Sequence, residues 1–223
     1  MNQTKYNLLK RVRDDIVNCH ACELYKSRKL PVIGNGSHDA EIMFIGEAPG
    51  EEEDRTGSPF VGTAGQVFNK LLTEIGIRRS NVYVCNIIKC HPPKNRDPKT
   101  EEKSACLSFL TRQIEAISPK FIVCLGRHAA AVVLPLFGLE KKVTSMGIMH
   151  GKVFEPDGLF KSMAIRTGAL SMFDIKFIVM YHPASVLYNQ AVSKQLKNDF
   201  QVLKSIILRH ASPLSVPTKV YRS

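Results

Sequence analysis

Long apolar runs are missing from this sequence. No uninterrupted apolar stretch approaches the roughly 20 residues that a membrane-spanning helix needs. The chain begins with the polar and charged residues MNQTKYNLLKRVRDD and lacks the apolar segment of a secretory signal. Internal repeats and low-complexity tracts are absent as well. We therefore expect a soluble protein of the cytoplasm that has no membrane partner.

Acidic residues are scarce in the last part of the chain, and none follows Asp199. Residues 141–223 hold 12 Lys and Arg against 4 Asp and Glu, a net charge of +8, whereas residues 1–140 have a net charge of +3. A basic half predicts a polyanionic partner, with nucleic acid the first candidate. Charge alone fits a merely solvated basic surface nearly as well.

The composition is that of a folded protein rather than a disordered one. The chain has 223 residues, of which 44% are hydrophobic, enough to fill one sizeable core. We expect a single domain over residues 1–209. Residues 210–223 are basic and hold two prolines, and they are expected to form a mobile tail.

Predicted strands and helices alternate along the chain. Apolar runs predict strands at 41–45, 82–88, 121–126 and 175–181. Helical periodicity predicts helices at 5–18, 63–76, 100–117, 127–137 and 190–209. The remaining long segments, 23–40, 89–99 and 151–173, are expected to be loops, the last one a hairpin or an irregular excursion. The alternation indicates an α/β protein with a central, mostly parallel sheet and helices on both faces.

Two local patterns refine this prediction. In the first helix, Leu8, Val12 and Ile16 are spaced four apart and should form its buried stripe. Directly after the first strand, a Gly/Pro turn carries four consecutive acids, residues 51–54, in a chain whose formal net charge is +11. Such a concentration of carboxylates in a basic protein requires an explanation.

Three polar side chains fall at the ends of predicted strands. Glu47 follows the first strand, Asn86 lies late in the second, and His182 follows the last. Sites in parallel sheets form at the carboxyl ends of the strands, so these residues should share one site. An asparagine in an otherwise apolar strand is also costly unless it is paired, which favours a function for Asn86.

Six cysteines divide into two groups. Cys85 and Cys124 lie inside apolar strands and are expected to be small core residues. The other four are a Cys-x-x-Cys pair and two single residues, namely Cys19, Cys22, Cys90 and Cys106. Four thiolates of this kind can hold an iron–sulfur cluster or a zinc ion, and their spacing leaves the two about even.

Several motifs occur together and in order. They are the Cys-x-x-Cys at residues 19–22, GEAPGEEED at 46–54, PFVGTAG at 59–65, CNIIKCHPP at 85–93 and YHPASVL at 181–187. This ordered set, from about residue 15 to 205, resembles the family 4 uracil-DNA glycosylases. The resemblance implies the three-layer α/β/α sandwich of that superfamily and a 4Fe–4S cluster on the four cysteines. It further implies a nucleoid-associated monomer that removes uracil from DNA.

The resemblance also implies roles for individual residues. Phe60 would stack on the flipped uracil, Asn86 would read its N3 and O4 edge, and His182 would bind O2 and stabilise the leaving base. Glu47 would stabilise positive charge on the sugar and orient water. Glu53 would guard the C5 edge, where thymine carries its methyl group.

Two features of the resemblance bear on mechanism. Ala48 stands where better-known members of the superfamily have a water-activating Asp, which leaves the general base open. Val186 and Leu187 stand where the superfamily inserts an apolar wedge into the base stack, although a buried turn would use them nearly as well. Residues 156–173 are longer than the family pattern suggests and have no assigned role.

Two other functions compete with this one. The first is a related enzyme that stays covalently bound to uracil-DNA, but the segment KCHPPKNRDPKTEEKSAC has no room for the basic insertion of that type. The second is a non-catalytic iron–sulfur DNA-binding domain with a degenerate pocket. The presence of Glu47, Phe60, Asn86 and His182 together argues against it.

Overall fold

The structure is a computed structural model that describes residues 3–156 and 175–210. Of the segment 151–173, which was expected to be a hairpin or an irregular excursion, residues 157–173 lie outside the described residues, and so does the predicted tail apart from His210. None of the helices within these residues is long and apolar enough to span a membrane.

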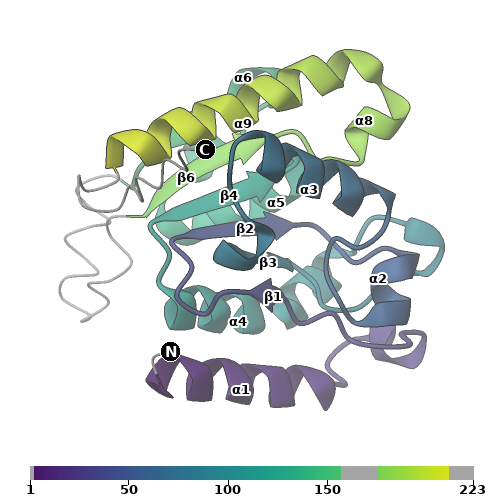
Figure 1. Ribbon diagram of the computed structural model, residues 1–223. Coiled ribbons are helices and arrows are strands. Elements are labelled where there is room, and N and C mark those ends of the chain that lie inside the picture. Colours follow the sequence, from purple (N-terminus) through teal and green to yellow (C-terminus); the bar gives the residue numbers. More distant parts are fainter. Residues whose placement is uncertain (1–2, 157–174, 211–223) are drawn as a thin grey trace, which may run out of the picture.

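A six-stranded sheet with the order β1-β3-β2-β4-β6-β5 forms the middle layer (Figure 1). The four central strands are mutually parallel, and the short strands β1 and β5 pair antiparallel at the two edges. In chain order the strands are β1 Asn35–Gly36, β2 Ile42–Gly46, β3 Tyr83–Asn86, β4 Phe121–Leu125, β5 Val153–Phe154 and β6 Lys176–Met180. The parallel strands at 41–45, 82–88, 121–126 and 175–181 are confirmed.

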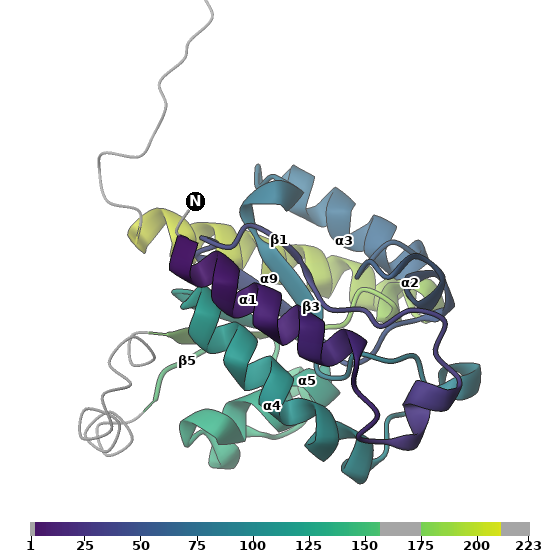
Figure 2. The same cartoon turned by 90° about the horizontal axis from the view of Figure 1, so that it is seen from below.

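Helices cover both faces of the sheet (Figures 1 and 2). On one face lie α3 and α9, and on the other lie α1, α4 and α5. The helices are α1 Gln3–Val17, α2 Glu51–Thr56, α3 Thr63–Glu74, α4 Thr100–Ile117, α5 Arg127–Val133, α6 Met146–Met149, α8 Ser185–Tyr188 and α9 Gln190–His210. The expected three-layer α/β/α sandwich is therefore confirmed.

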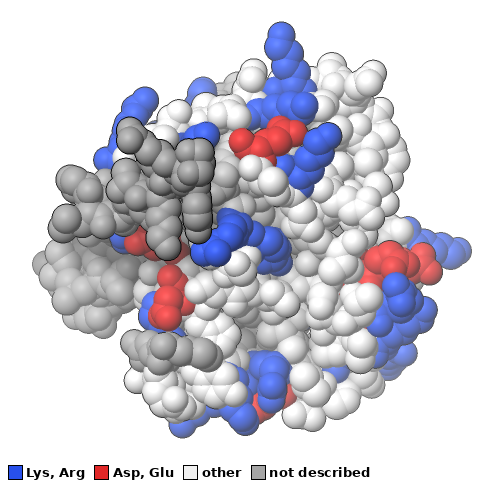
Figure 3. All heavy atoms as spheres, in the orientation of Figure 1, with Lys and Arg blue, Asp and Glu red and all other residues white. Residues whose placement is uncertain are grey.

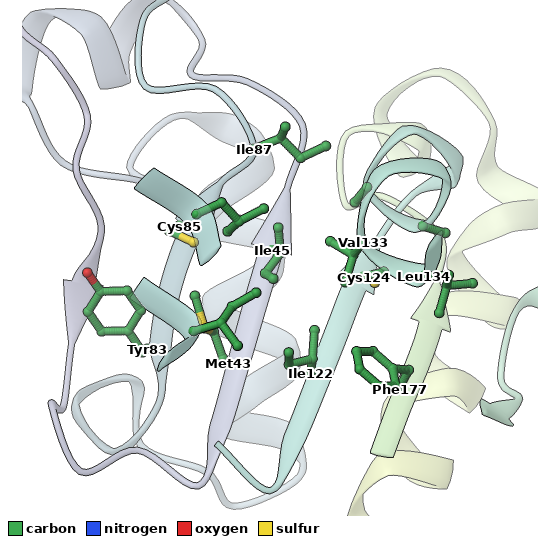
Figure 4. Close-up of a cluster of buried hydrophobic side chains, with 14 of the residues drawn as sticks. Met43, Ile45, Tyr83, Cys85, Ile87, Ile122, Cys124, Val133, Leu134 and Phe177 are labelled. Atoms are coloured by element: carbon green, nitrogen blue, oxygen red, sulfur yellow. The ribbon is translucent and has the colours of Figure 1, made fainter. Parts of the chain in front are cut away.

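Alternating side chains of the strands fill two separate hydrophobic clusters. Along β2, Met43 and Ile45 belong to the cluster under α1, α4 and α5, whereas Ile42 and Phe44 belong to the cluster under α3 and α9. This period of two is what a strand buried on both faces requires. Figure 4 shows Cys85 and Cys124 within the first cluster, among Met43, Ile45 and other apolar side chains. Both cysteines are fully buried, as predicted for core residues.

Three predictions about local structure were wrong. The buried stripe of α1 consists of Leu9, Val12 and Ile16, while Leu8 is 43% exposed. The residues 51–54 do not form a turn, because they are the first turn of the helix α2. Carboxylates are favourable there, since the first backbone N–H groups of a helix lack intrahelical acceptors and carry the positive end of its dipole. Within the expected loop 23–40, the structure also has the edge strand β1.

Candidate active site

A cavity of about 280 Å³ opens at the carboxyl ends of β2 and β3. Six residues that the sequence singled out line it together, and they are Glu47, Ala48, Glu53, Phe60, Asn86 and His182. The three polar residues predicted to meet at the strand ends therefore do meet. The lining also includes residues from the loop before α4, among them Pro92, Asn95, Arg96 and Asp97.

Asn86 lines this cavity and carries an unsatisfied amide oxygen. It is the last residue of β3 and only 2% exposed, and its Oδ1 is buried without a hydrogen-bond partner among the described residues. An unpaired buried polar atom costs about 1–3 kcal/mol, so proteins rarely keep one without a use. The unpaired oxygen indicates that Asn86 is a ligand-binding residue, because a bound ligand could donate the missing hydrogen bond.

Gly46 makes room for that amide. The parallel register of β2 and β3 sets Gly46 opposite Asn86. A Cβ atom at position 46 would lie 2.4 Å from Asn86 Oδ1 and 2.8 Å from Phe60 Cζ. Only glycine therefore allows the amide and the ring to close over the end of β2.

Phe60 is held in an unusual backbone conformation. Its φ of 57° lies in the left-handed region, which is uncommon for an aromatic residue and indicates that the surroundings enforce it. Its ring lies 5.2 Å from that of Phe68 and 5.8 Å from that of His182, measured between centroids. The ring is thus placed between the core and the cavity.

Glu53 holds the segment after Phe60 in place through hydrogen bonds to its backbone. One carboxylate oxygen, Oε1, accepts hydrogen bonds from the backbone N–H groups of Val61 (2.9 Å) and Gly62 (2.8 Å). The other, Oε2, accepts from the N–H of Gly50, the residue before α2, at 3.1 Å. Part of the acidic cluster therefore has a structural use, because α2 and the Phe60 segment are joined through this one side chain.

His182 is oriented by its own loop. The N–H of Ala184 donates to His182 Nδ1 at 3.1 Å, so in the neutral ring the proton lies on Nε2. Burial lowers the pKa of His182 to about 4. The side chain is therefore a neutral hydrogen-bond donor at neutral pH.

Glu47 lines the cavity, and its side chain is 22% exposed. Its Oε1 is buried and makes no hydrogen bond with the described residues. Nδ1 of His128, at the start of α5, is 3.4 Å away. Burial raises the pKa of Glu47, and the charge of His128 opposes that rise.

The four cysteines of the second group line a separate small cavity, together with Arg28 and Lys89. Arg28 Nη1 donates to Cys90 Sγ at 3.3 Å, and the backbone N–H of Lys89 donates to the Cys106 thiol. Burial raises the pKa of the Cys106 thiol to about 11 and also raises the pKa of Cys90. A cationic group at the cavity would be needed to keep these buried thiols deprotonated.

Lys89 joins the cysteine cavity to the main cavity and was not anticipated from the sequence. The side chain is 1% exposed, and its Nζ donates to the backbone oxygen of Asn86 (2.6 Å) and to Gln113 Oε1 (2.7 Å). Gln113 in turn donates to the backbone oxygen of Ile33 at 2.8 Å. A lysine within the apolar run NIIKC was the signal that could have revealed this network.

The two wedge candidates differ in their surroundings. Val186 packs against the cluster under α3 and α9, as a buried turn residue would. Leu187 is 45% exposed, and the next residue of α8, Tyr188, is 88% exposed. The exposed apolar surface of α8 thus includes Leu187 and Tyr188, whereas Val186 is partly buried.

Comparison with known proteins identifies the family of this chain. The model of the uracil DNA glycosylase superfamily matches residues 33–204. That match covers more than half of the chain, and the chain belongs to this superfamily.

Individual relatives place the chain more narrowly. A type-4 uracil-DNA glycosylase of Thermotoga maritima is 49% identical over 206 residues, which cover 92% of this chain and 97% of that protein. A type-4 uracil-DNA glycosylase of Archaeoglobus fulgidus is 43% identical over 187 residues, covering 84% and 87%. A type-5 uracil-DNA glycosylase of Pyrobaculum aerophilum is 33% identical over 144 residues, covering only 58% and 62%. Within the superfamily, the chain is a member of the type-4 family.

The backbone of Phe60 provides a first test of the site. A Cβ at Gly65 in α3 would lie 2.0 Å from the backbone oxygen of Phe60, so Gly65→Ala must displace that backbone. We expect a loss of about 2–4 kcal/mol in the free energy of unfolding, measured by urea denaturation. The control is Gly147→Ala in α6, where a Cβ would have no atom within 4 Å. Alanine there should be neutral or stabilise by up to about 1 kcal/mol. Equal stability of the two variants would contradict the packing described for Phe60.

Proposed function

We propose that this protein hydrolyses the N-glycosidic bond of deoxyuridine in DNA, releases uracil and leaves an abasic site, as the first step of base excision repair. The observation that carries the proposal is the buried amide of Asn86, a residue that lines the cavity of about 280 Å³ and whose Oδ1 has no hydrogen-bond partner among the described residues. Uracil N3–H is a donor that would complete this oxygen, and uracil O4 would accept from the amide NH₂.

The base would reach the cavity by leaving the duplex. A base inside the stack is inaccessible, so the nucleotide must rotate into the pocket, where Phe60 offers an aromatic face for stacking. We propose that Ala48 and the adjoining backbone of the Gly/Pro turn contact the base. Glu53 would border its C5 edge, where its engaged carboxylate cannot move aside for the methyl group of thymine.

Catalysis would separate charge between the sugar and the base. As the bond from C1′ to N1 breaks, its electron pair moves onto the uracil ring and reaches O2, while positive charge develops on the sugar. The Nε2–H of neutral His182 would donate to O2 and stabilise the uracil anion. Glu47 would stabilise the sugar cation and hold the water that attacks C1′. We assign the proton of this water to Glu47, because Ala48 offers no carboxylate.

We further propose that Cys19, Cys22, Cys90 and Cys106 hold a 4Fe–4S cluster. Among the described residues, only Glu47, Asp97 and His128 bring three potential ligand atoms within 4.8 Å of one another. No three of the four cysteine sulfurs therefore lie within 4.8 Å of one another, whereas the sulfurs around a single tetrahedral zinc ion with bonds of 2.3 Å would be roughly 4 Å apart, and this wider spacing supports a larger group. When bound, such a cluster would supply a structural link between the segment after α1, the loop after β3 and α4.

The protein would act on DNA as an intracellular monomer. Figure 3 shows Lys and Arg in several separate groups on one face, most of them beside acidic side chains, in a chain whose formal net charge is +11. Dispersed cations of this kind suit contacts with a phosphate backbone. Leu187 of α8 is proposed as the side chain that fills the space left by the flipped nucleotide, with Val186 supporting it from the core.

Substitutions at Asn86 test the proposed base reading. Asn86→Ala should lower the single-turnover rate of uracil release by about 100-fold or more, because the buried reader is lost. Asn86→Asp replaces the donor with an acceptor that suits cytosine N4–H₂ and repels uracil O4, so it should lose most uracil release and gain weak release of cytosine. The assay is alkali cleavage of an oligonucleotide that contains one uracil or one cytosine.

The control for this series is Asn69→Asp on the exposed side of α3, which should retain the wild-type rate. Uracil release by Asn86→Asp at the wild-type rate would show that Asn86 does not read the base. A protein–DNA adduct that survives denaturation would favour the covalent alternative, and binding without release would favour the non-catalytic one.

Cysteine substitutions test the cluster separately. Protein purified without oxygen should be brown and contain about four irons per chain. Cys106→Ala should lose the colour and most of the iron, whereas Cys124→Ala, which removes a core sulfur outside the second group, should keep both. Visible absorption and iron analysis provide the measurement. Stoichiometric zinc without iron in the wild-type protein would contradict the assignment.

A further inference from the structure

We propose that His128 is a positioning residue that holds the Glu47 carboxylate ionised and directed at the reacting sugar, and that Asp97 holds His128 from its other side. This inference rests on the proposed function, in which Glu47 acts on the sugar and the attacking water. Nothing in the sequence motifs pointed to His128 or to Asp97.

The contacts of Glu47 give the first reason. Its Oε1 is buried and has no hydrogen-bond partner among the described residues, although Nδ1 of His128 lies only 3.4 Å away. The second ring nitrogen of His128, Nε2, is 3.9 Å from Asp97 Oδ2. The imidazole therefore stands between two carboxylates and has one ring nitrogen toward each.

The position of His128 in the fold gives the second reason. It is the second residue of α5, directly after β4, and β4 pairs with β2, the strand that leads into Glu47. His128 lines a neighbouring cavity of about 370 Å³ together with Glu47 and His182, but it is absent from the lining of the main cavity. It is thus placed behind Glu47, where it can act on that carboxylate without touching the base.

Charges from several elements converge on Glu47. Burial raises the pKa of Glu47, and Asp97 raises it further, while His128 of α5 and Lys103 of α4 lower it. Glu53 of α2 and His182 after β6 face the same main cavity. Arg96 and Arg127 also line the two cavities that Glu47 borders. Of His128 and Lys103, His128 has a nitrogen 3.4 Å from the carboxylate. Its removal would therefore leave a half-buried carboxylate that takes up a proton more readily as the pH falls.

A divalent cation is the main competing explanation for this cluster, because Glu47, Asp97 and His128 bring ligand atoms within 4.8 Å of one another. The two explanations predict different pH dependences of activity in variants of His128 and Asp97. A positioning role predicts opposite effects of removing His128 and Asp97, since the first lowers and the second raises the pKa of Glu47. A metal site predicts that either removal abolishes activity at every pH.

The test is the pH profile of single-turnover uracil release by the iron-loaded full chain. His128→Gln should shift the acidic limb of the profile to higher pH. Its loss of rate at about pH 5 should exceed its loss at about pH 8 by about threefold, because a half-exposed ion pair contributes up to about 1 kcal/mol. Asp97→Asn should shift the limb to lower pH. His210→Gln, at the exposed end of α9, is the matched control and should follow the wild-type profile.

The outcomes separate this inference from the proposed function. If the wild type releases uracil and the acidic limbs of both variants are unchanged, the positioning role of His128 is overturned and the proposed function is not. Absence of uracil release by the wild type would overturn the proposed function. Loss of wild-type activity in EDTA with recovery on adding Mn²⁺ or Zn²⁺ would show that the three residues form a metal site and overturn the positioning role.

Discussion

The absence of a side chain at Gly46 is the constraint on which the site depends. The sheet places the end of β2 beside the end of β3, and the parallel register sets residue 46 opposite residue 86. With any Cβ at this position, Asn86 Oδ1 and Phe60 Cζ could not stay where they are, since they would lie 2.4 and 2.8 Å from it. The Asn86 amide and the Phe60 ring thus meet only because the strand ends in glycine.

A second layer of contacts holds those two residues from behind. Glu53 ties α2 to the segment after Phe60 through three backbone N–H groups. Lys89 reaches the backbone of Asn86 with its side chain and the Cys106 thiol with its own N–H. The cysteine cavity and the main cavity are therefore joined through a single residue of the loop after β3. A cluster bound there would stabilise the segment that carries Asn86 without taking part in the chemistry.

The sequence predicted the elements that produce a local pattern of apolar and polar residues. Strands such as β4 are buried on both faces and appear as unbroken apolar runs, and Asn86 was conspicuous because it interrupts one. The sequence did not predict contacts that depend on tertiary placement. His128 lies 81 positions from Glu47, and no spacing rule connects them. The acids of α2 were assigned to a turn, because a helix of six residues is too short to show periodicity.

Substitution of Gly46 tests the central claim most directly. Gly46→Ala should lower the single-turnover rate of uracil release by about 100-fold or more, because a shift of about 1 Å in Asn86 and Phe60 disrupts the geometry of the bound base. The iron content and the unfolding transition should stay close to those of the wild type, since the displaced atoms belong to side chains at the cavity. Uracil release by this variant at the wild-type rate would contradict the site described here.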